Sequence, residues 1–186
     1  TSLVDFFCCD KKNVLKEAVK LNSNSFHICE GYDEMLEYPK KVEKEYDVSF
    51  IGSVYGDRQK WLSSIEGKVS VFNNVFGPMH SEIVSRTKIN LNLCTASGAS
   101  DRIYKVLGAG GFLLTNDWDG REEMFKDGKE IVIYQDAADL NDKIKFFLAN
   151  QQAREEIANN GHSAVQKYNR RQWAKHLVKY YDKLYR

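Results

Sequence analysis

The sequence predicts an α/β fold with a Rossmann-like, doubly wound parallel sheet and a helical C-terminal part. Short apolar segments of strand character alternate with segments of helical periodicity, which is typical of a parallel sheet covered by helices. The clearest strand is Asp47–Ser53, which ends in a glycine and a serine. From Asp136 onward, apolar residues recur at helical spacing.

Composition bounds the class of protein. The 186 residues, 42% hydrophobic and 28% charged, are enough for one well-packed globular domain with an appendage. A net charge of +1 gives no reason to expect nucleic-acid binding. No apolar run approaches the length of a membrane span and no signal peptide is visible, so we expect no transmembrane segment and a cytoplasmic location.

The cysteine pattern argues against zinc and against a disulfide framework. Cys8, Cys9, Cys29 and Cys94 have no Cys-x-x-Cys spacing, and no paired histidines accompany them. We therefore expect buried free thiols and no metal site.

Three regions are predicted along the chain. Residues 1–45 form a strand–helix–strand segment and a linker from a preceding domain, with a charged stretch over Glu34–Glu45 that resembles a linker or a surface excursion. Residues 46–170 form the Rossmann-like domain. Residues 171–186 form a last helix whose aromatic face either packs on Leu3–Cys9 or lies exposed.

The most informative segment is Ser100–Leu114, which follows the strand Ile89–Cys94. Strand, polar loop, helix, glycine-rich turn and strand succeed one another here. This arrangement places a helix N-terminus, with unpaired backbone N–H groups, at the carboxyl edge of the sheet, where anionic ligands bind. The loops 52–58, 95–102 and 116–123 reach the same edge.

These loops supply the candidate ligand residues. The predicted contacts to a diphosphate are Gly52, Ser53, Arg58, Ser97, Gly98, Ser100, Arg102 and Lys105. Structural alternatives stay open: Arg58 is solvated, Ser100 only caps the helix, and Asp101 pairs with Lys105 four residues later.

Sugar or nucleotide contacts are predicted in the acidic loop, from Asn116, Asp117, Glu122 and Glu123. The alternative is that these acids only favour the first turn of a helix.

Two other groups are interpreted as structural. Gly108, Gly110 and Gly111 follow a helix, so they indicate a helix end with close packing and not a dinucleotide fingerprint. His80 and His162 lack an orienting partner in the sequence, so we expect surface or cap roles for them.

The segments Tyr46–Ser53, Ser100–Leu114 and Glu122–Glu130, with Gln166–Arg171 near the end, resemble the C-terminal domain of CgeB-like glycosyltransferases. The resemblance covers roughly Asp47 to the C-terminus. It implies one half of a two-domain GT-B fold, in which this half binds a nucleotide-sugar donor and generally needs no bound metal or other cofactor. Many relatives carry a glutamate for the nucleotide ribose where this chain has Lys105, and a lysine cannot accept those bonds.

The resemblance therefore predicts a donor-binding glycosyltransferase domain, hexosyltransferase in type, that acts on an unknown acceptor. A missing N-terminal domain or partner chain supplies the acceptor contacts, so the isolated chain should bind donor with little transfer. Two alternatives are a non-catalytic nucleotide or sugar-phosphate binding module that acts through a protein partner, and a GT-B-like sugar-nucleotide epimerase. The epimerase needs carboxylate pairs at the cleft, and only residues 117–123 offer candidates.

Overall fold

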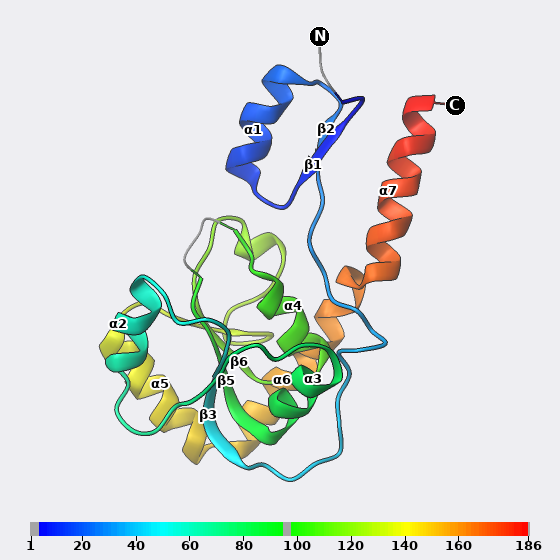
Figure 1. Cartoon of the computed structure of the whole chain (residues 1–186). Helices are drawn as coiled ribbons and strands as arrows, with labels where there is room; N and C mark the ends of the chain where they lie inside the picture. Colours follow the sequence, from blue (N-terminus) through cyan, green and yellow to red (C-terminus); the bar gives the residue numbers. More distant parts are fainter. Residues whose placement is uncertain (1–3, 95–97, 186) are drawn as a thin grey trace.

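A sheet of five parallel strands forms the centre of the computed structural model, which describes residues 4–94 and 98–185 (Figure 1). The strands are β3 (Tyr46–Ile51), β4 (Ser70–Phe72), β5 (Thr87–Asn92), β6 (Leu113–Asn116) and β7 (Val132–Tyr134). They lie in the order β4-β3-β5-β6-β7. The chain moves outward from β3 to β4 and then returns past β3 to β5, so the winding direction reverses between β3 and β5. The sheet is doubly wound, as the sequence predicts.

Helices cover both faces of this sheet (Figure 1). One face packs against α2 (Asp57–Ser63) and α5 (Ala137–Ala149), and the other against α3 (Gly77–Arg86) and α4 (Asp101–Gly108), while α6 (Gln151–Val165) contributes to both cores. Each face of the sheet has its own hydrophobic core, and successive residues of a strand point into opposite cores. Leu113 belongs to one core and Leu114 to the other. Within residues 4–94 and 98–185, no helix combines the length and the apolar character needed to cross a membrane.

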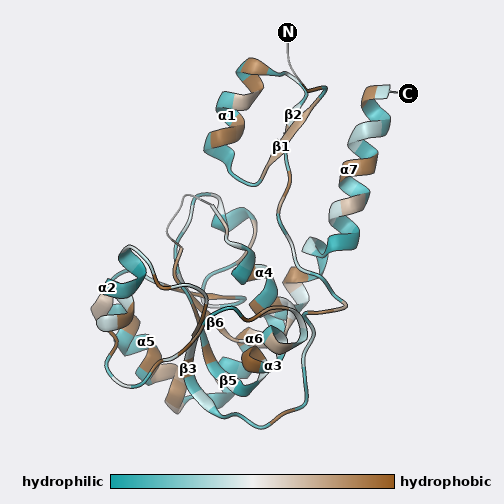
Figure 2. Ribbon diagram, in the orientation of Figure 1, coloured by the Kyte–Doolittle hydropathy of each residue, from teal (hydrophilic) through white to brown (hydrophobic). Residues whose placement is uncertain are grey.

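A smaller unit at the N-terminus consists of β1 (Phe7–Cys9), α1 (Lys12–Leu21) and β2 (Ser25–His27), with β1 and β2 paired in parallel. The last helix, α7 (Arg170–Tyr185), runs beside it (Figure 1). The Tyr180 ring stacks on Phe26 with centroids 3.7 Å apart, so the aromatic face of α7 packs on this unit in part. Figure 2 shows apolar segments on α1. Of its apolar residues, Val14, Val19 and Leu21 are exposed. That residues 1–45 come from a preceding domain stays a prediction.

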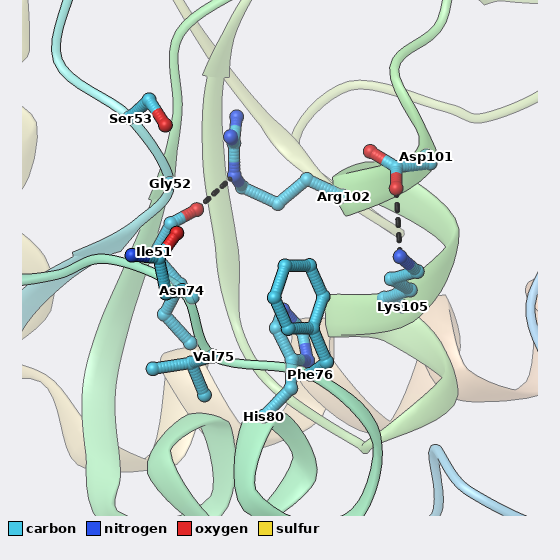
Figure 3. Close-up of a pocket in the computed structure, with 10 residues that line it drawn as sticks. All are labelled: Ile51, Gly52, Ser53, Asn74, Val75, Phe76, His80, Asp101, Arg102 and Lys105. Atoms are coloured by element: carbon cyan, nitrogen blue, oxygen red, sulfur yellow. Dashed lines mark hydrogen bonds and ion pairs between the residues drawn. The ribbon is translucent and has the colours of Figure 1, made fainter.

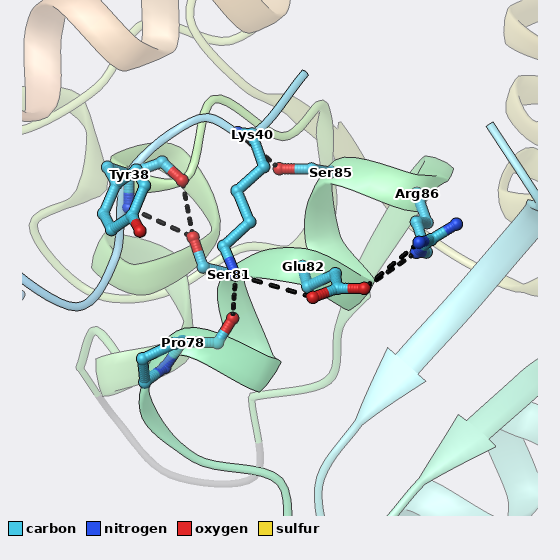
Figure 4. Close-up of polar contacts among 7 residues, drawn as sticks. All are labelled: Tyr38, Lys40, Pro78, Ser81, Glu82, Ser85 and Arg86. Atoms are coloured by element: carbon cyan, nitrogen blue, oxygen red, sulfur yellow. Dashed lines mark hydrogen bonds and ion pairs between the residues drawn. The ribbon is translucent and has the colours of Figure 1, made fainter. Parts of the chain in front are cut away.

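The charged stretch before β3 lies mostly exposed on the surface and is fastened to α3. Its role as a linker from a preceding domain stays a prediction. We call residues 38–45 the α3 strap (Figure 4). The Ser81 hydroxyl donates to the Tyr38 carbonyl at 2.6 Å and accepts from the Tyr38 N–H at 3.1 Å, and the Ser85 hydroxyl accepts from the Lys40 N–H. Because these serines satisfy backbone groups of the strap, it holds its place with few apolar contacts.

The glycines after α4 are packing residues, as expected. The Gly111 N–H donates to the Val106 carbonyl at 2.9 Å, and Gly110 has a φ of +70°, which together close the helix end. A Cβ on Gly108 would lie 2.4 Å from the ring of Tyr32. The close approach of helix and ring therefore requires glycine.

All four cysteines are free thiols, as the sequence predicts, but each is only half-buried. Cys8 and Cys9 lie on β1, which belongs to a sheet of only two strands. The expectation of buried thiols is therefore wrong in degree.

Gly161 in α6 provides a test of this packing. A Cβ there would lie 2.3 Å from the carbonyl oxygen of Glu130 and 2.8 Å from a methyl group of Leu107. Helix propensity alone would make Gly161→Ala stabilising by about 1 kcal/mol, but overpacking against backbone reverses the sign. We expect Gly161→Ala to lower the free energy of unfolding by about 1–3 kcal/mol in urea denaturation.

The control is Ser163→Ala, because Ser163 lies exposed on the same helix. An increase in stability for Gly161→Ala, equal to or above that of the control, would contradict the close contact.

Candidate functional site

The carboxyl ends of β3 and β5 meet at the point where the winding of the sheet reverses, and Arg102 joins them. Its Nε donates to the carbonyl of Ile51, the last residue of β3, at 2.6 Å. Its Nη1 donates to Oδ1 of Asn92, the last residue of β5, at 2.8 Å. Ligands of open α/β sheets bind at this reversal point, outside the carboxyl ends of the strands. Arg102 therefore occupies the predicted ligand edge.

The Arg102 guanidinium is buried without a counter-ion. Only 8% of the residue is exposed, and the guanidinium carbon lies 4.6 Å from the centroid of the Phe50 ring. Burial, and then the positive charge of Arg58, lower the pKa of Arg102 to about 10. In the part of the chain that the structure describes, no carboxylate forms an ion pair with Arg102. Its charge is thus available to an anion in the crevice.

Arg58 is buried beside it, which excludes the solvated alternative. It too has 8% of its surface exposed. Its Nε and Nη1 donate to the carbonyls of Leu93 and Ser53 at 3.2 and 3.0 Å, and the Tyr55 ring lies 4.4 Å from its guanidinium carbon. Among the described residues no carboxylate pairs with it either. Two like charges are therefore held against the same Phe50 ring by neutral partners.

Gly52 makes room for this arrangement. A Cβ at Gly52 would lie 2.3 Å from Nη2 of Arg102, and its φ of +148° is one that side chains rarely allow. The predicted role of Gly52 in close backbone approach is therefore seen toward Arg102. Gly52 and Ser53 both line the first of the two cavities described below.

Asn92 organises the polar groups at the end of β5, and the sequence analysis missed it. Besides Arg102, its Oδ1 accepts from the Ser100 hydroxyl at 2.9 Å, and its Nδ2 donates to Thr115 Oγ1 at 2.9 Å. Ser100 thus occupies the cap position of α4 but gives its side chain to Asn92 and makes no capping bond. The signal for Asn92 was a polar residue inside an apolar central strand.

Two cavities flank the start of α4, and Asp101 lines both. The first has a volume of about 150 Å³ and is shown in Figure 3; the second has about 200 Å³. Each is smaller than the roughly 300 Å³ typical of a ligand pocket, so an elongated ligand would extend across the helix start. Asp101 and Lys105 form the predicted i,i+4 ion pair at 2.7 Å.

The second cavity lies between the N-terminal unit and the sheet. Arg58, Gly98 and Ser100 line it from one side, and Asp10 and Glu30 from the other. Burial, followed by the negative charges of Asp101 and Asp10, raises the pKa of Glu30. Asp10 and Glu30 were not singled out in the sequence, because they lie outside the three loops at the sheet edge. The predicted contact Ser97 lies outside the described residues.

The acidic loop is occupied by internal contacts. The Asn116 amide accepts from the Cys94 N–H at 2.7 Å and donates to its carbonyl at 2.9 Å, which ties β6 to β5. Asp117 pairs with Arg121 at 3.1 Å, and Glu123 pairs with Lys12 of α1 at 2.5 Å. Glu122 and Glu123 belong to the short 3-10 helix η1 (Arg121–Glu123). These residues line neither cavity beside α4, and their predicted ligand contacts stay predictions.

His80 is buried in the first cavity, so the expected surface or cap role is wrong. It has 5% of its surface exposed and lines the cavity with Arg102 and Lys105. Its Nδ1 is fully buried, and none of the residues that the structure describes hydrogen-bonds to it. Burial, then the charges of Lys105 and Arg102, lower the pKa of His80 to about 4. His162 by contrast has its Nδ1 2.9 Å from the carbonyl of Leu107, near the end of α4.

The fold and the buried arginines define an α/β domain with positive charge at the switch point of its sheet. The sequence matches the glycosyl transferase-like family over residues 34–179, and the chain belongs to that family. A comparison with curated protein sequences found no match.

Solved structures share the fold. HepE from Anabaena in complex with UDP and glucose has a TM-score of 0.78 at 11% identity, covering 97% of this chain and 64% of that one. The GtfA/B complex gives 0.70 at 17% (97% and 46%), and the pneumococcal O-GlcNAc transferase GtfA in complex with UDP and GlcNAc gives 0.68 at 14% (97% and 45%). The predicted α/β fold, one half of a GT-B glycosyltransferase, is confirmed, and the chain spans 45 to 64% of these proteins.

The buried imidazole predicts a pH-dependent stability. Because the folded-state pKa of His80, about 4, lies below the ordinary 6.5, the unfolded chain binds the extra proton first as the pH falls. Stability from this group is fully present above pH 6.5 and is lost between about pH 6.5 and 4, by at most about 3 kcal/mol.

We therefore expect the free energy of unfolding, measured by urea denaturation, to fall less steeply over this range in His80→Phe and in His80→Gln than in the wild type. Equal slopes in all three proteins would show that His80 is not the titrating group.

Proposed function

We propose that the chain is the donor-binding domain of a CgeB-like, GT-B glycosyltransferase and binds a nucleotide-diphosphate sugar for transfer to an acceptor. The observation that carries the proposal is the pair of buried guanidiniums of Arg58 and Arg102 beside the start of α4, which have no carboxylate partner within residues 4–94 and 98–185. Two like charges in a crevice are stabilised most by a ligand with two adjacent negative charges. The family membership and the UDP in the similar structures support the same ligand class.

In this proposal the diphosphate lies across the N-terminus of α4. The positive end of the α4 dipole and the Nη2 of Arg102 face it, and Gly98 and Ser100 border it. As the sugar–phosphate bond breaks, negative charge grows on the leaving diphosphate. Fixed donors and buried positive charge stabilise that change and lower the barrier. The nucleoside then occupies the first cavity and the sugar the second.

The acceptor site belongs to a second Rossmann-like half, from a preceding part of the protein or a partner chain. Asp10 and Glu30 stand at the sugar cavity on the side of the N-terminal unit. Carboxylates there suit sugar hydroxyls, which donate hydrogen bonds to them. We further propose a cytoplasmic location, in keeping with the free thiols.

Titration calorimetry with UDP and uridine tests the diphosphate site. Arg102→Met keeps most of the side-chain volume but removes the charge. We expect it to weaken UDP binding about 10- to 100-fold, the loss of one or two charge-assisted hydrogen bonds. Uridine, which has no phosphate, should lose less than about threefold under the same measure.

The matched control is Arg154→Met, which removes another buried arginine, one that donates to the Phe147 carbonyl away from both cavities. It should leave the ratio of UDP to uridine affinity unchanged. Equal losses of UDP and uridine in Arg102→Met would contradict a phosphate contact. Absence of binding by UDP-, GDP-, dTDP- and CMP-sugars would contradict the donor-domain proposal.

A further inference from the structure

Among the described residues, neither ring nitrogen of His80 has a hydrogen-bond partner. Its Nδ1 is buried without a partner, and no described residue hydrogen-bonds to its Nε2. A neutral imidazole offers one N–H donor and one lone-pair acceptor. Buried polar groups of this kind are nearly always satisfied in folded proteins, and each orphan needs an explanation. Because Nδ1 is enclosed, Nε2 is the ring nitrogen that a ligand in the cavity lined by His80 can reach.

The neighbours of His80 show which ligand group would meet it. Figure 3 places its ring beside Phe76, with the start of α4 across the cavity. On that side Lys105 is committed to Asp101, and Arg102 to the ends of β3 and β5. The Asn74 amide is exposed, so water satisfies it. His80 is therefore the buried, uncharged acceptor of this cavity.

The order of groups in a nucleotide then selects the ligand group. With the diphosphate at the start of α4 and the nucleoside in the first cavity, the group bonded to the diphosphate on that side is the ribose. Ribose hydroxyls donate hydrogen bonds, whereas phosphate oxygens only accept them and favour the charged Arg102.

We propose that His80 binds the ribose of the nucleotide, with its unprotonated ring nitrogen accepting a hydrogen bond from the 2′- or the 3′-hydroxyl. This inference rests on the proposed function, because it requires a nucleotide in the first cavity. It makes His80 a specificity-determining residue that distinguishes ribonucleotides from deoxyribonucleotides. The lowered pKa of His80 keeps the ring neutral at pH 7, so the lone pair is present there. It also gives the cavity a ribose acceptor in spite of the lysine at position 105.

The test is calorimetry of UDP, 2′-deoxy-UDP and 3′-deoxy-UDP, with the GDP series in parallel. The wild type should bind one of the two deoxy analogues about 3- to 10-fold more weakly than the ribonucleotide, the equivalent of one neutral hydrogen bond. His80→Phe, which keeps a ring but no nitrogen, should bind the ribonucleotide as weakly as that analogue, so the ratio becomes about one. His80→Leu is a second variant without an acceptor, in case the larger ring disturbs packing.

His80→Gln keeps an acceptor and should keep part of the discrimination. Met79→Leu, at the exposed neighbouring position, should keep all of it. Wild-type ratios in both His80→Phe and His80→Leu, or equal binding of all three ligands by the wild type, would overturn the role of His80 and leave the diphosphate site standing. Failure of the wild type to bind UDP and GDP, together with the dTDP- and CMP-sugars, would overturn both proposals.

Discussion

The site depends on one buried amide, that of Asn92. Its oxygen accepts from Arg102 and from Ser100, and its nitrogen reaches Thr115 on the neighbouring strand. The end of β5, the loop behind it, the first turn of α4 and β6 thus meet at a single side chain. Removing that acceptor would leave buried donors unsatisfied, and the carboxyl edge of the sheet would lose its geometry before any ligand contact was touched.

A second constraint is the management of positive charge. Arg58 and Arg102 both lie against the Phe50 ring, at 5.8 and 4.6 Å from its centroid, and both donate to neutral oxygens. The ring face and the oriented carbonyl dipoles offset part of the repulsion. They do so without a carboxylate, which would compete with an anionic ligand. The two arginine charges therefore stay unpaired in the unliganded domain, which makes its folded state less stable than it would be with paired charges.

Much of the fold was predictable because the periods of its apolar residues differ: the strands are continuous apolar runs, and the helices repeat at three to four residues. Arg102 and Gly52 were predictable because residue type and position at a strand end or helix start suffice. The burial of Arg58 and His80 was not, since it depends on which elements pack over them. The α3 strap resembled a linker because serines of α3, not its own apolar side chains, hold it. The ligand contacts of Asn116, Asp117 and Glu122 stay predictions, and these residues line neither of the two cavities beside α4.

The close contact of Gly52 and Arg102 has a consequence for related sequences. Any side chain at position 52 would occupy the space of the Arg102 Nη2, so we expect positions 52 and 102 to covary. Chains with this fold that gain a side chain at 52 should also replace the arginine, and those that keep the arginine should keep the glycine. The pair can therefore serve as a two-letter marker, readable without a structure, for members that retain this buried charge.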